Sequence, residues 1–471
     1  MKLSEFKQNL GLKSHPANFW NQAESNRVQC HLCPRNCQIS DQNSGFCRVR
    51  WNDGGSLVTL NYGVSVEMTE EVIETEAVYH YAPGSKILSL GNVGCMMNCS
   101  YCHNWNTSQM KYVEKRHIHH YTPEQVVSTA LEKGINTISW TYNDPVVWHE
   151  FVYDTAKLAK AHGIKNLFKS AFYIGPEAID KLAEVIDIFS LSLKSMDPKF
   201  YMRFTKGRLE PVLEAIKQVY RYGNKHLEIS NLVVTEANDN MEDVRKVVEW
   251  VLKELDDEVP LHFVRFHPDY KYTQVGRTSV EFLKQARQYA IDHGIKHCYL
   301  GNVYEKGEWL NSRCRDCNHL LVERFGMRSE ATGVNQLGQC SACGAPSRVV
   351  PPPASVTKSA PVALESYPAR IHHNWGHDVN SAHVVTKNKS SASRLVVCAH
   401  HGVEGTVRKI ELKPGETWRF LVSRAHGQST GISLGCADDV EVEIVETLDR
   451  AHFPVPASTP NPLAGGMSDG V

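Results

Sequence analysis

KILSLGNVGCMMNCSYC, residues 86–102, joins a short apolar run to a loop rich in cysteine. The run Lys86–Leu90 has the character of a strand, and Gly91 and Gly94 then open the loop. Within the loop, the spacing C-x3-C-x2-C places Cys95, Cys99 and Cys102. Iron–sulfur clusters are normally held by four cysteines, so three thiolates predict a 4Fe–4S cluster with one iron open to a small molecule. A zinc site completed by a distant residue is the alternative.

Strand and helix patterns alternate from this loop to about residue 300. The expected helices end at glycines, the usual stop signal: Gly134, Gly163, Gly223 and Gly294. The expected strands are apolar and β-branched, as in a sheet covered on both faces; they span residues 137–142, 165–172, 186–194, 226–234, 261–267 and 296–300. This alternation predicts a parallel sheet closed or nearly closed into a barrel. Function in such barrels sits at the carboxyl ends of the strands, where the cysteine loop lies.

Several motifs resemble the radical S-adenosylmethionine (radical SAM) superfamily. Within it, the chain is similar to the pyruvate formate-lyase activating enzyme-like branch and to the AmmeMemoRadiSam system radical enzymes. The resemblance covers about residues 28–345 and rests on the cysteine loop together with Cys30-His-Leu-Cys33-Pro-Arg-Asn-Cys37, Gly45-Phe-Cys47-Arg48, Thr141-Tyr-Asn-Asp-Pro145, Leu193-Lys194, Gly207-Arg-Leu-Glu-Pro-Val212, Glu228-Ile-Ser-Asn-Leu232, Asn238-Asp239, Arg265-Phe-His-Pro268 and Gly301-Asn-Val303. It implies an α/β fold, a partial (β/α) TIM-like radical SAM barrel.

The resemblance also implies residue roles. Cys95, Cys99 and Cys102 would hold the cluster, and S-adenosylmethionine would chelate the open iron through its amine and carboxylate. The segment that receives the amino group is matched by Thr141, Tyr142, Asn143 and Asp144. Lys194 matches a lysine that contacts the cofactor, and Tyr101 is placed to stack on the adenine. One electron would cleave the sulfonium into methionine and a 5′-deoxyadenosyl radical, which removes hydrogen from the substrate; the protein supplies positioning and a dry cavity.

The chain departs from the family pattern at three places. Ser192 stands two residues before the lysine, where relatives tend to have an acidic residue. Lys169-Ser-Ala-Phe-Tyr173 replaces the usual Thr-Asn-Gly, and His103 follows the third cysteine where glutamine is common. These departures concern the ends of the third and fourth strands, so the substrate is expected to differ from that of close relatives.

Two further sets of cysteines have metal-site spacing. Ahead of the barrel, C-x2-C-x3-C-x9-C is formed by Cys30, Cys33, Cys37 and Cys47, which predicts either a structural zinc or an auxiliary iron–sulfur cluster. Behind the barrel, two C-x2-C knuckles predict a zinc ribbon: Cys314, Cys317, Cys340 and Cys343. A rubredoxin-like iron or an auxiliary cluster is the alternative for this second set. Cys298 is read as an isolated buried strand residue.

The pattern predicts six segments along the 471 residues. A proline-rich run, Pro351–Pro361, suggests a linker, and the short strands after it suggest a small all-β domain. The segments are a Cys-rich N-terminal part (1–84), the barrel (85–310), the ribbon (311–347), the linker (348–374), an accessory β domain (375–450) and a disordered tail (451–471).

Composition narrows the functional classes. The 51 basic and 52 acidic residues include no dense basic run, which disfavours nucleic acid as a partner. We expect no membrane span and no signal peptide, and the cysteine usage favours the cytoplasm. The expected partners are a low-potential reductant such as flavodoxin or ferredoxin and a protein substrate, through activation of a glycyl radical enzyme or modification of another partner. A radical enzyme acting on a small metabolite and a non-enzymatic iron–sulfur or zinc scaffold are the alternatives.

Overall fold

The protein is described from a computed structural model. The described residues are 3–303, 305, 307–352, 371–374, 379–391, 394–401, 407–423, 431–436 and 439–448. The chain divides into two compact units, Met1–Ser355 and Val356–Val471, and each is treated by itself. The predicted tail, 451–471, lies outside the described residues, as does most of the predicted linker.

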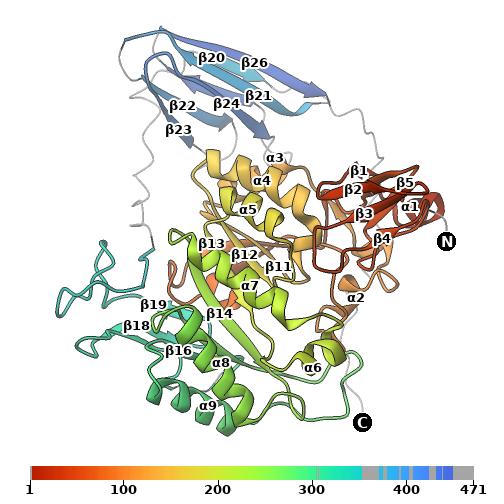
Figure 1. Ribbon diagram of the computed structural model, residues 1–471. Coiled ribbons are helices and arrows are strands. Elements are labelled where there is room, and N and C mark those ends of the chain that lie inside the picture. The colour runs from red at the N-terminus through yellow and green to blue at the C-terminus, as the bar shows by residue number, and fades with distance from the viewer. Residues whose placement is uncertain are drawn as a thin grey trace, which may run out of the picture. The chain divides into compact units, whose positions relative to one another are not determined.

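An eight-stranded sheet forms the centre of the first unit (Figure 1). In spatial order its strands are β16 (Cys298–Gly301), β15 (Leu261–Arg265), β14 (His226–Val233), β13 (Ile188–Ser192), β12 (Lys165–Ser170), β11 (Thr137–Thr141), β9 (Lys86–Gly91) and β8 (Thr69–Val72). All neighbours are parallel except β8, which is antiparallel to β9. Among the described residues the two edge strands do not pair with each other, so the predicted barrel is an open sheet. The polar strand β8 was missed by the sequence pattern, which recognises apolar runs.

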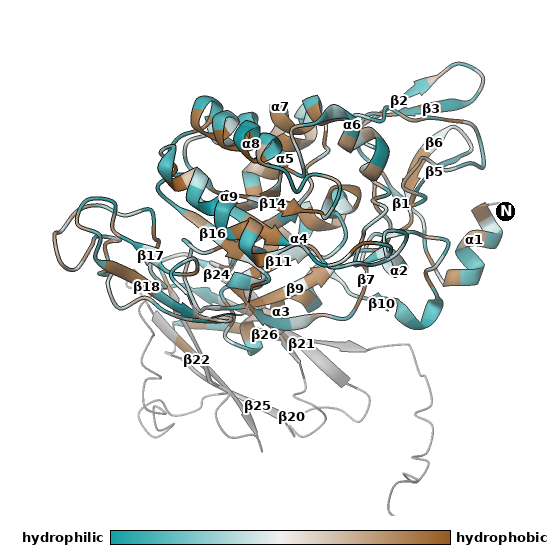
Figure 2. Cartoon of the chain, turned by 90° about the horizontal axis from the view of Figure 1, so that it is seen from below, coloured by the Kyte–Doolittle hydropathy of each residue, from teal (hydrophilic) through white to brown (hydrophobic). Residues whose placement is uncertain are grey.

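Helices lie along the outer side of this sheet (Figure 1). The long ones are α3 (Pro123–Glu132), α4 (His149–Ala161), α5 (Pro176–Val185), α7 (Leu209–Arg221), α8 (Met241–Glu254) and α9 (Val280–Asp292), and the short ones are α2 (Trp105–Ser108) and α6 (Pro198–Phe200). Figure 2 shows apolar strands inside and helices with polar outer faces, as expected for a buried parallel sheet. Ahead of α4, Pro145–Trp148 forms a 3-10 turn capped by Asp144.

Small antiparallel sheets flank the central one. The described N-terminal part begins with α1 (Leu3–Leu10). One small sheet consists of β1 (His15–Pro16), β6 (Ser56–Thr59) and β5 (Arg50–Asp53), and a second consists of β2 (Trp20–Ala23), β3 (Arg27–Cys30) and β4 (Gln38–Ile39). In a third, β7 (Val64–Ser65) pairs with β10 (His119–His120), which follows β9 in the chain. After the central sheet, β17 (Ser312–Arg313), β18 (Leu320–Phe325) and β19 (Arg328–Glu330) pair in the segment predicted to be a ribbon. The two outer cysteine sets belong to these small sheets and the turns between them.

A buried polar network occupies the amino-terminal end of the central sheet. The Glu228 carboxylate accepts hydrogen bonds from the backbone N–H of Tyr79 at 2.9 Å and of His80 at 2.7 Å, and lies 2.6 Å from His262 Nε2. Burial raises the pKa of Glu228, but the hydrogen bonds with His226 and His262 outweigh it and hold this pKa well below its usual value. On the other side, Arg324 of β18 donates to Ser312 Oγ at 2.9 Å and to the carbonyl of Tyr79. The network therefore joins the flanking β17–β19 sheet to the central strands.

The second unit contains two antiparallel sheets in its described residues. One has the order β20 (Ile371–Asn374), β25 (Gly431–Gly435), β22 (Arg394–His401), β23 (Val407–Leu412), and the other β24 (Thr417–Ser423), β21 (Val379–Asn388), β26 (Val440–Leu448). Their buried core residues are Val384, Val396, Leu412, Ile432, Leu434 and Val440. Strand β20 lies inside the range predicted to be linker, and β21 was also missed, because histidine, asparagine and serine interrupt both apolar patterns.

Candidate metal centre and active site

The loop that carries Cys95, Cys99 and Cys102 leaves the carboxyl end of β9. Backbone hydrogen bonds hold its middle: Asn98 N–H donates to Thr205 O at 3.0 Å and Ser100 N–H donates to Phe204 O at 2.8 Å. The Cys95 thiol accepts from Met97 N–H at 3.3 Å, and Cys102 Sγ lies 3.5 Å from Ser108 Oγ. The structure thus anchors the predicted cluster loop at the edge of the sheet where the strands end.

Burial makes ionisation of the thiols in this loop unfavourable. Burial raises the pKa of Cys99 to about 11, which the nearby Lys194 ammonium partly offsets, and burial raises the pKa of Cys95 well above its usual range. Neighbouring thiols raise both pKa values further. Buried thiols of this kind ionise when they bind a metal, because the metal supplies the charge that water no longer screens.

The predicted S-adenosylmethionine segment lies beside the loop, at the end of β11. Thr141 Oγ1 donates to Glu76 at 2.7 Å, and the Tyr142 hydroxyl contacts Thr69 Oγ1. Asn143 donates to the carbonyl of Asn92 and accepts from Thr107 Oγ1 at 3.1 Å. The side chains of Thr141, Tyr142 and Asn143 are therefore engaged with protein in the structure.

Asp144 is the most heavily bonded member of that segment. It is 2% exposed, and its two carboxylate oxygens accept hydrogen bonds from Ser170 Oγ at 2.8 Å, Ala171 N–H at 2.9 Å and Val146 N–H at 3.2 Å. Burial raises the pKa of Asp144 to about 6, against the lowering effect of these bonds and of Lys194. Asp144 thus ties the end of β11 to the loop after β12.

Lys194 follows β13 with its backbone firmly placed. Its N–H donates to the Tyr201 hydroxyl at 3.1 Å, and its carbonyl accepts from Asn238 Nδ2 at 2.7 Å. Its ammonium lies 5.9 Å from the centre of the Tyr101 ring and makes no hydrogen bond to another described residue. The lysine is therefore held by its backbone, with its charge directed at the cysteine loop. Asn238, which sequence reasoning gave no role, supplies part of this support.

Tyr101 is placed differently from the prediction. It is 2% exposed and packs among Phe200, Phe266 and Lys194, with ring centres 6.0 Å from Phe200 and 6.4 Å from Phe266. A ring enclosed in this way does not favour stacking on an adenine. The nearby His103 instead stacks on His267 at 3.6 Å, with 10° between the ring planes.

Two charged residues at the central sheet, Glu76 and Lys169, interact with each other, and the sequence did not predict this interaction. Glu76, from the 3-10 turn Ile73–Glu76, is 3% exposed and accepts from Ser139 Oγ at 2.9 Å, beside its bond from Thr141. Lys169 of β12 donates to Ser190 and Ser230 Oγ, both at 3.0 Å. Burial lowers the pKa of Lys169 to about 8, and Glu76 partly offsets this shift. The replacement of the family's usual residues at the third strand thus brings a buried ammonium under the candidate active site.

The residues of the loop fit a 4Fe–4S cluster with S-adenosylmethionine on its open iron. Three soft thiolates are the donors that such a cluster uses. Beside them, the buried Asn92 Oδ1 has no hydrogen-bond partner within the described part of the chain, which leaves an acceptor available to an amine. The loop thus offers both a ligand set for iron and an unsatisfied polar atom for the cofactor.

The radical SAM superfamily model matches residues 89–251. An uncharacterised protein of Methanocaldococcus jannaschii is 37% identical over 330 residues, which is 70% of this chain and 97% of that protein. The chain belongs to the radical SAM superfamily. It is a radical SAM enzyme, and the superfamily domain implies a 4Fe–4S cluster and S-adenosylmethionine as cofactors.

Two characterised relatives share less of the sequence. Pyruvate formate-lyase-activating enzyme of Listeria monocytogenes is 23% identical to this radical SAM enzyme over 39% of its chain and 77% of the relative. GTP 3′,8-cyclase of Peptoclostridium acidaminophilum is 24% identical over 37% of this chain and 53% of the relative. Sequence similarity therefore identifies the superfamily, and the two relatives differ in what their names say they act on.

The ribbon cysteines of this radical SAM enzyme converge on one point. Cys314 Sγ lies 3.7 Å from Cys343 Sγ, Cys317 Sγ lies 3.7 Å from Cys340 Sγ, and the four sulfurs lie within 4.8 Å of one another. Four thiolates at about 2.3 Å from a tetrahedral metal would be about 3.8 Å apart. The set therefore suits a single tetrahedral metal ion, and its geometry does not distinguish zinc from iron. None of the described helices of the enzyme is long and apolar enough to cross a membrane.

Proposed function

We propose that Cys95, Cys99 and Cys102 hold the 4Fe–4S cluster and that S-adenosylmethionine binds beside it, between the ends of β11 and β13. A reduced cluster held by these three thiolates would supply the one-electron reductive cleavage of S-adenosylmethionine from which hydrogen abstraction follows. The observation that carries this proposal is the anchored cysteine loop at the carboxyl edge of the sheet, with Lys194 and Asp144 near enough for their charges to act on its thiols.

The surrounding residues have separate tasks in this proposal. Lys194 presents an ammonium that pairs with the cofactor carboxylate or a ribose oxygen, since its charge makes no hydrogen bond to the described protein. Asp144 keeps the ends of β11 and β12 together, and thereby positions the segment that receives the amino group. Asn92 Oδ1 offers an acceptor to the same amine.

For the substrate we propose a protein, activated or modified through hydrogen abstraction. The similarity to an enzyme named pyruvate formate-lyase-activating enzyme supports this class. The similarity to GTP 3′,8-cyclase supports the small-molecule alternative. For the reductant we propose a low-potential one-electron carrier of the flavodoxin or ferredoxin class. For the ribbon cysteines we propose zinc, which is the usual metal of paired C-x2-C knuckles.

The test is production of 5′-deoxyadenosine by the full-length protein, reconstituted anaerobically with iron and sulfide and given dithionite and S-adenosylmethionine. Cys99→Ala removes a thiolate of the proposed cluster, and Cys298→Ala is the matched control, since Cys298 is buried on β16 outside all three cysteine sets. We expect product from the wild type and from Cys298→Ala and none from Cys99→Ala.

Each outcome decides between hypotheses. Equal product from both variants would show that the radical chemistry does not use this loop. No product from wild type with a well-formed cluster would favour the scaffold hypothesis. Given product, isotope transfer from deuterium-labelled candidate substrates into 5′-deoxyadenosine separates a protein substrate from a small metabolite.

A further inference from the structure

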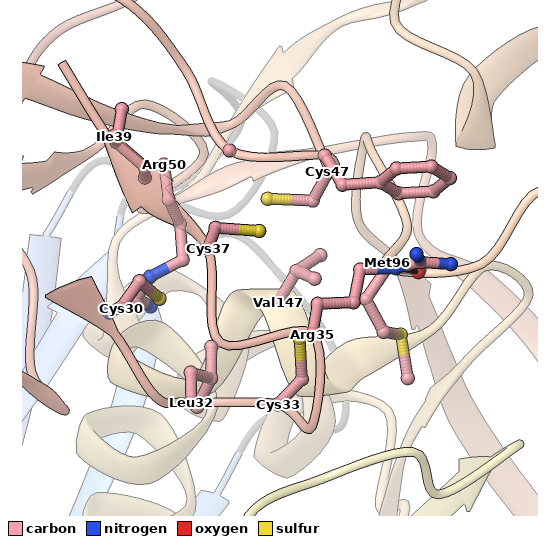
Figure 3. Close-up of a pocket in the computed structure, with 12 residues that line it drawn as sticks. Cys30, Leu32, Cys33, Arg35, Cys37, Ile39, Cys47, Arg50, Met96 and Val147 are labelled. Carbon is pink, nitrogen blue, oxygen red and sulfur yellow. Dashed lines mark hydrogen bonds between the residues drawn. The ribbon is translucent and has the colours of Figure 1, made fainter. Parts of the chain in front are cut away.

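Four cysteines of the N-terminal segment surround one hollow. Their side chains are directed into it from the end of β3, the turn before β4 and the loop before β5 (Figure 3). The hollow is narrow, with a cavity volume of about 20 Å³, and its sulfur lining consists of Cys30, Cys33, Cys37, Cys47 and Met96. Cysteines up to 17 positions apart in sequence thus meet at one place, as ligands of a shared inorganic group do.

The geometry of this set differs from that of the ribbon cysteines. In the ribbon, four sulfurs close to within 4.8 Å of one another, as a single tetrahedral ion requires. Among the described residues, the sulfurs of Cys30, Cys33, Cys37 and Cys47 do not all lie within 4.8 Å of one another. They line the hollow instead. A group larger than one ion fits this arrangement, because cysteines of an iron–sulfur cluster bind different iron atoms and stand further apart.

A buried, unpaired donor lines the same hollow. Arg50 is 2% exposed, and its Nη1 is paired with Glu150 at 3.0 Å, but its Nε–H has no hydrogen-bond partner in the described structure. Its positive charge acts on Cys30 and Cys47. An N–H left unpaired in the interior costs free energy, whereas inorganic sulfide or a metal-bound thiolate would accept its hydrogen bond. The hollow therefore contains an unused donor suited to a sulfur-rich anion.

The hollow also adjoins the cluster loop of the radical site. Met96, next to Cys95, forms part of its wall, and Arg35, which also lines the hollow, donates to the Met96 carbonyl. A Cβ atom on Gly94 would lie 2.7 Å from Val49 Cγ1 and 3.0 Å from the Cys47 carbonyl oxygen, so the two loops pack backbone against backbone. A metal group in the hollow would be a direct neighbour of the first one.

We propose that Cys30, Cys33, Cys37 and Cys47 hold a second iron–sulfur cluster, with Arg50 Nε–H donating to its sulfur. The sequence alone left zinc and a cluster open for this set. The proposal concerns a site of its own and stands whether or not the radical reaction is the one proposed above.

The test measures iron, zinc and inorganic sulfide per chain in full-length protein purified and reconstituted without oxygen. A variant with Cys95, Cys99 and Cys102 all replaced by alanine lacks the first cluster. We expect it to keep iron with an equal amount of inorganic sulfide, and to lose both when Cys33→Ala is added. Cys298→Ala in the same background should leave the content unchanged.

The wild type provides a second measurement that needs no variant. Two 4Fe–4S clusters require about eight inorganic sulfides per chain, and one such cluster requires about four. In the reduced protein, electron paramagnetic resonance should show two interacting centres, and addition of Cys33→Ala should leave a single, narrower signal. A sulfide content of about four in the wild type, or a folded triple variant that holds zinc without sulfide, would overturn the proposal.

Discussion

Arg50 and Glu150 form an ion pair at 3.0 Å, with side chains that are 2% and 4% exposed. Arg50 lies on β5 of the N-terminal segment and Glu150 lies on α4 beside the central sheet. Glu150 Oε1 also accepts from Asn18 N–H at 2.7 Å. The pair thus joins the segment that carries the first four cysteines to the domain that carries the radical loop, although 100 residues separate the partners.

Replacing Glu150 by glutamine should destabilise the protein strongly. The Arg50 charge would stay buried without its partner, which costs about 3–5 kcal/mol. Urea unfolding of the anaerobic protein measures the loss. Glu249→Gln is the matched control, because it breaks an exposed pair with Arg245 at 2.7 Å, where we expect a loss under about 1 kcal/mol. Similar losses for the two variants would mean that the buried pair is not a stabilising link.

Acid should weaken the fold through His297. Burial lowers the pKa of this histidine to about 4 in the folded protein, while an unfolded histidine has a pKa of about 6.5. Between these values the unfolded chain binds the extra proton, so stability is full above about pH 6.5 and falls as the pH falls. From pH 7.5 to 5.5 this histidine alone should lower the free energy of unfolding by about 1 kcal/mol. Urea unfolding at both pH values measures it, and His297→Gln should show a smaller difference. An unchanged difference would place the acid sensitivity elsewhere.

Asp144→Asn should weaken binding of S-adenosylmethionine about tenfold, the equivalent of about 1.4 kcal/mol. The amide puts an N–H where Ser170, Ala171 or Val146 already donates, so the contact between the ends of β11 and β12 is disturbed. Equilibrium dialysis with labelled cofactor measures the dissociation constant, beside the Michaelis constant for 5′-deoxyadenosine formation. Asp154→Asn is the control, since Asp154 accepts only from the exposed Tyr62 hydroxyl at 2.7 Å among the described bonds. If Asp144→Asn binds S-adenosylmethionine with unaltered affinity, Asp144 does not position the segment that binds the cofactor.

Removal of the ribbon metal should loosen β17–β19 without abolishing the radical site. Four thiols at 3.7 Å repel one another once ionised, and the small sheet has few buried apolar residues. A chelator or Cys317→Ser should release one metal ion per chain and open residues 312–350 to protease. Limited proteolysis with metal analysis follows both events, and 5′-deoxyadenosine formation should persist. A protease-resistant, metal-free protein would show that the metal is dispensable for folding.

Local pattern was enough for part of this protein. The parallel strands of the central sheet and the long helices between them were predicted within a few residues, since apolar runs and glycine stops report secondary structure directly. The edge strand β8 was not predicted, because its residues Thr69–Val72 carry two glutamates and pair only through backbone bonds with β9. The sequence also predicted that the strand ends form one site, because the carboxyl ends of parallel strands meet at the same edge of a sheet. It did not predict the tight enclosure of Tyr101, which depends on Phe200 and Phe266 from distant segments.

The sequence by itself determined the alternation of strands and helices, the superfamily motif and the grouping of eleven cysteines into three sets. These features depend on spacing along the chain, which fixes where turns occur and which cysteines can bind one metal group. Only the tertiary structure decided how those sets differ. It closed the sulfurs of Cys314–Cys343 to a single-ion geometry, arranged those of Cys30–Cys47 around a hollow and placed that hollow against Met96. It also buried Arg50, Glu76 and Lys169 beside partners from remote segments. Distances between sulfurs and the pairing of buried charges depend on how separate elements pack, which no local spacing specifies.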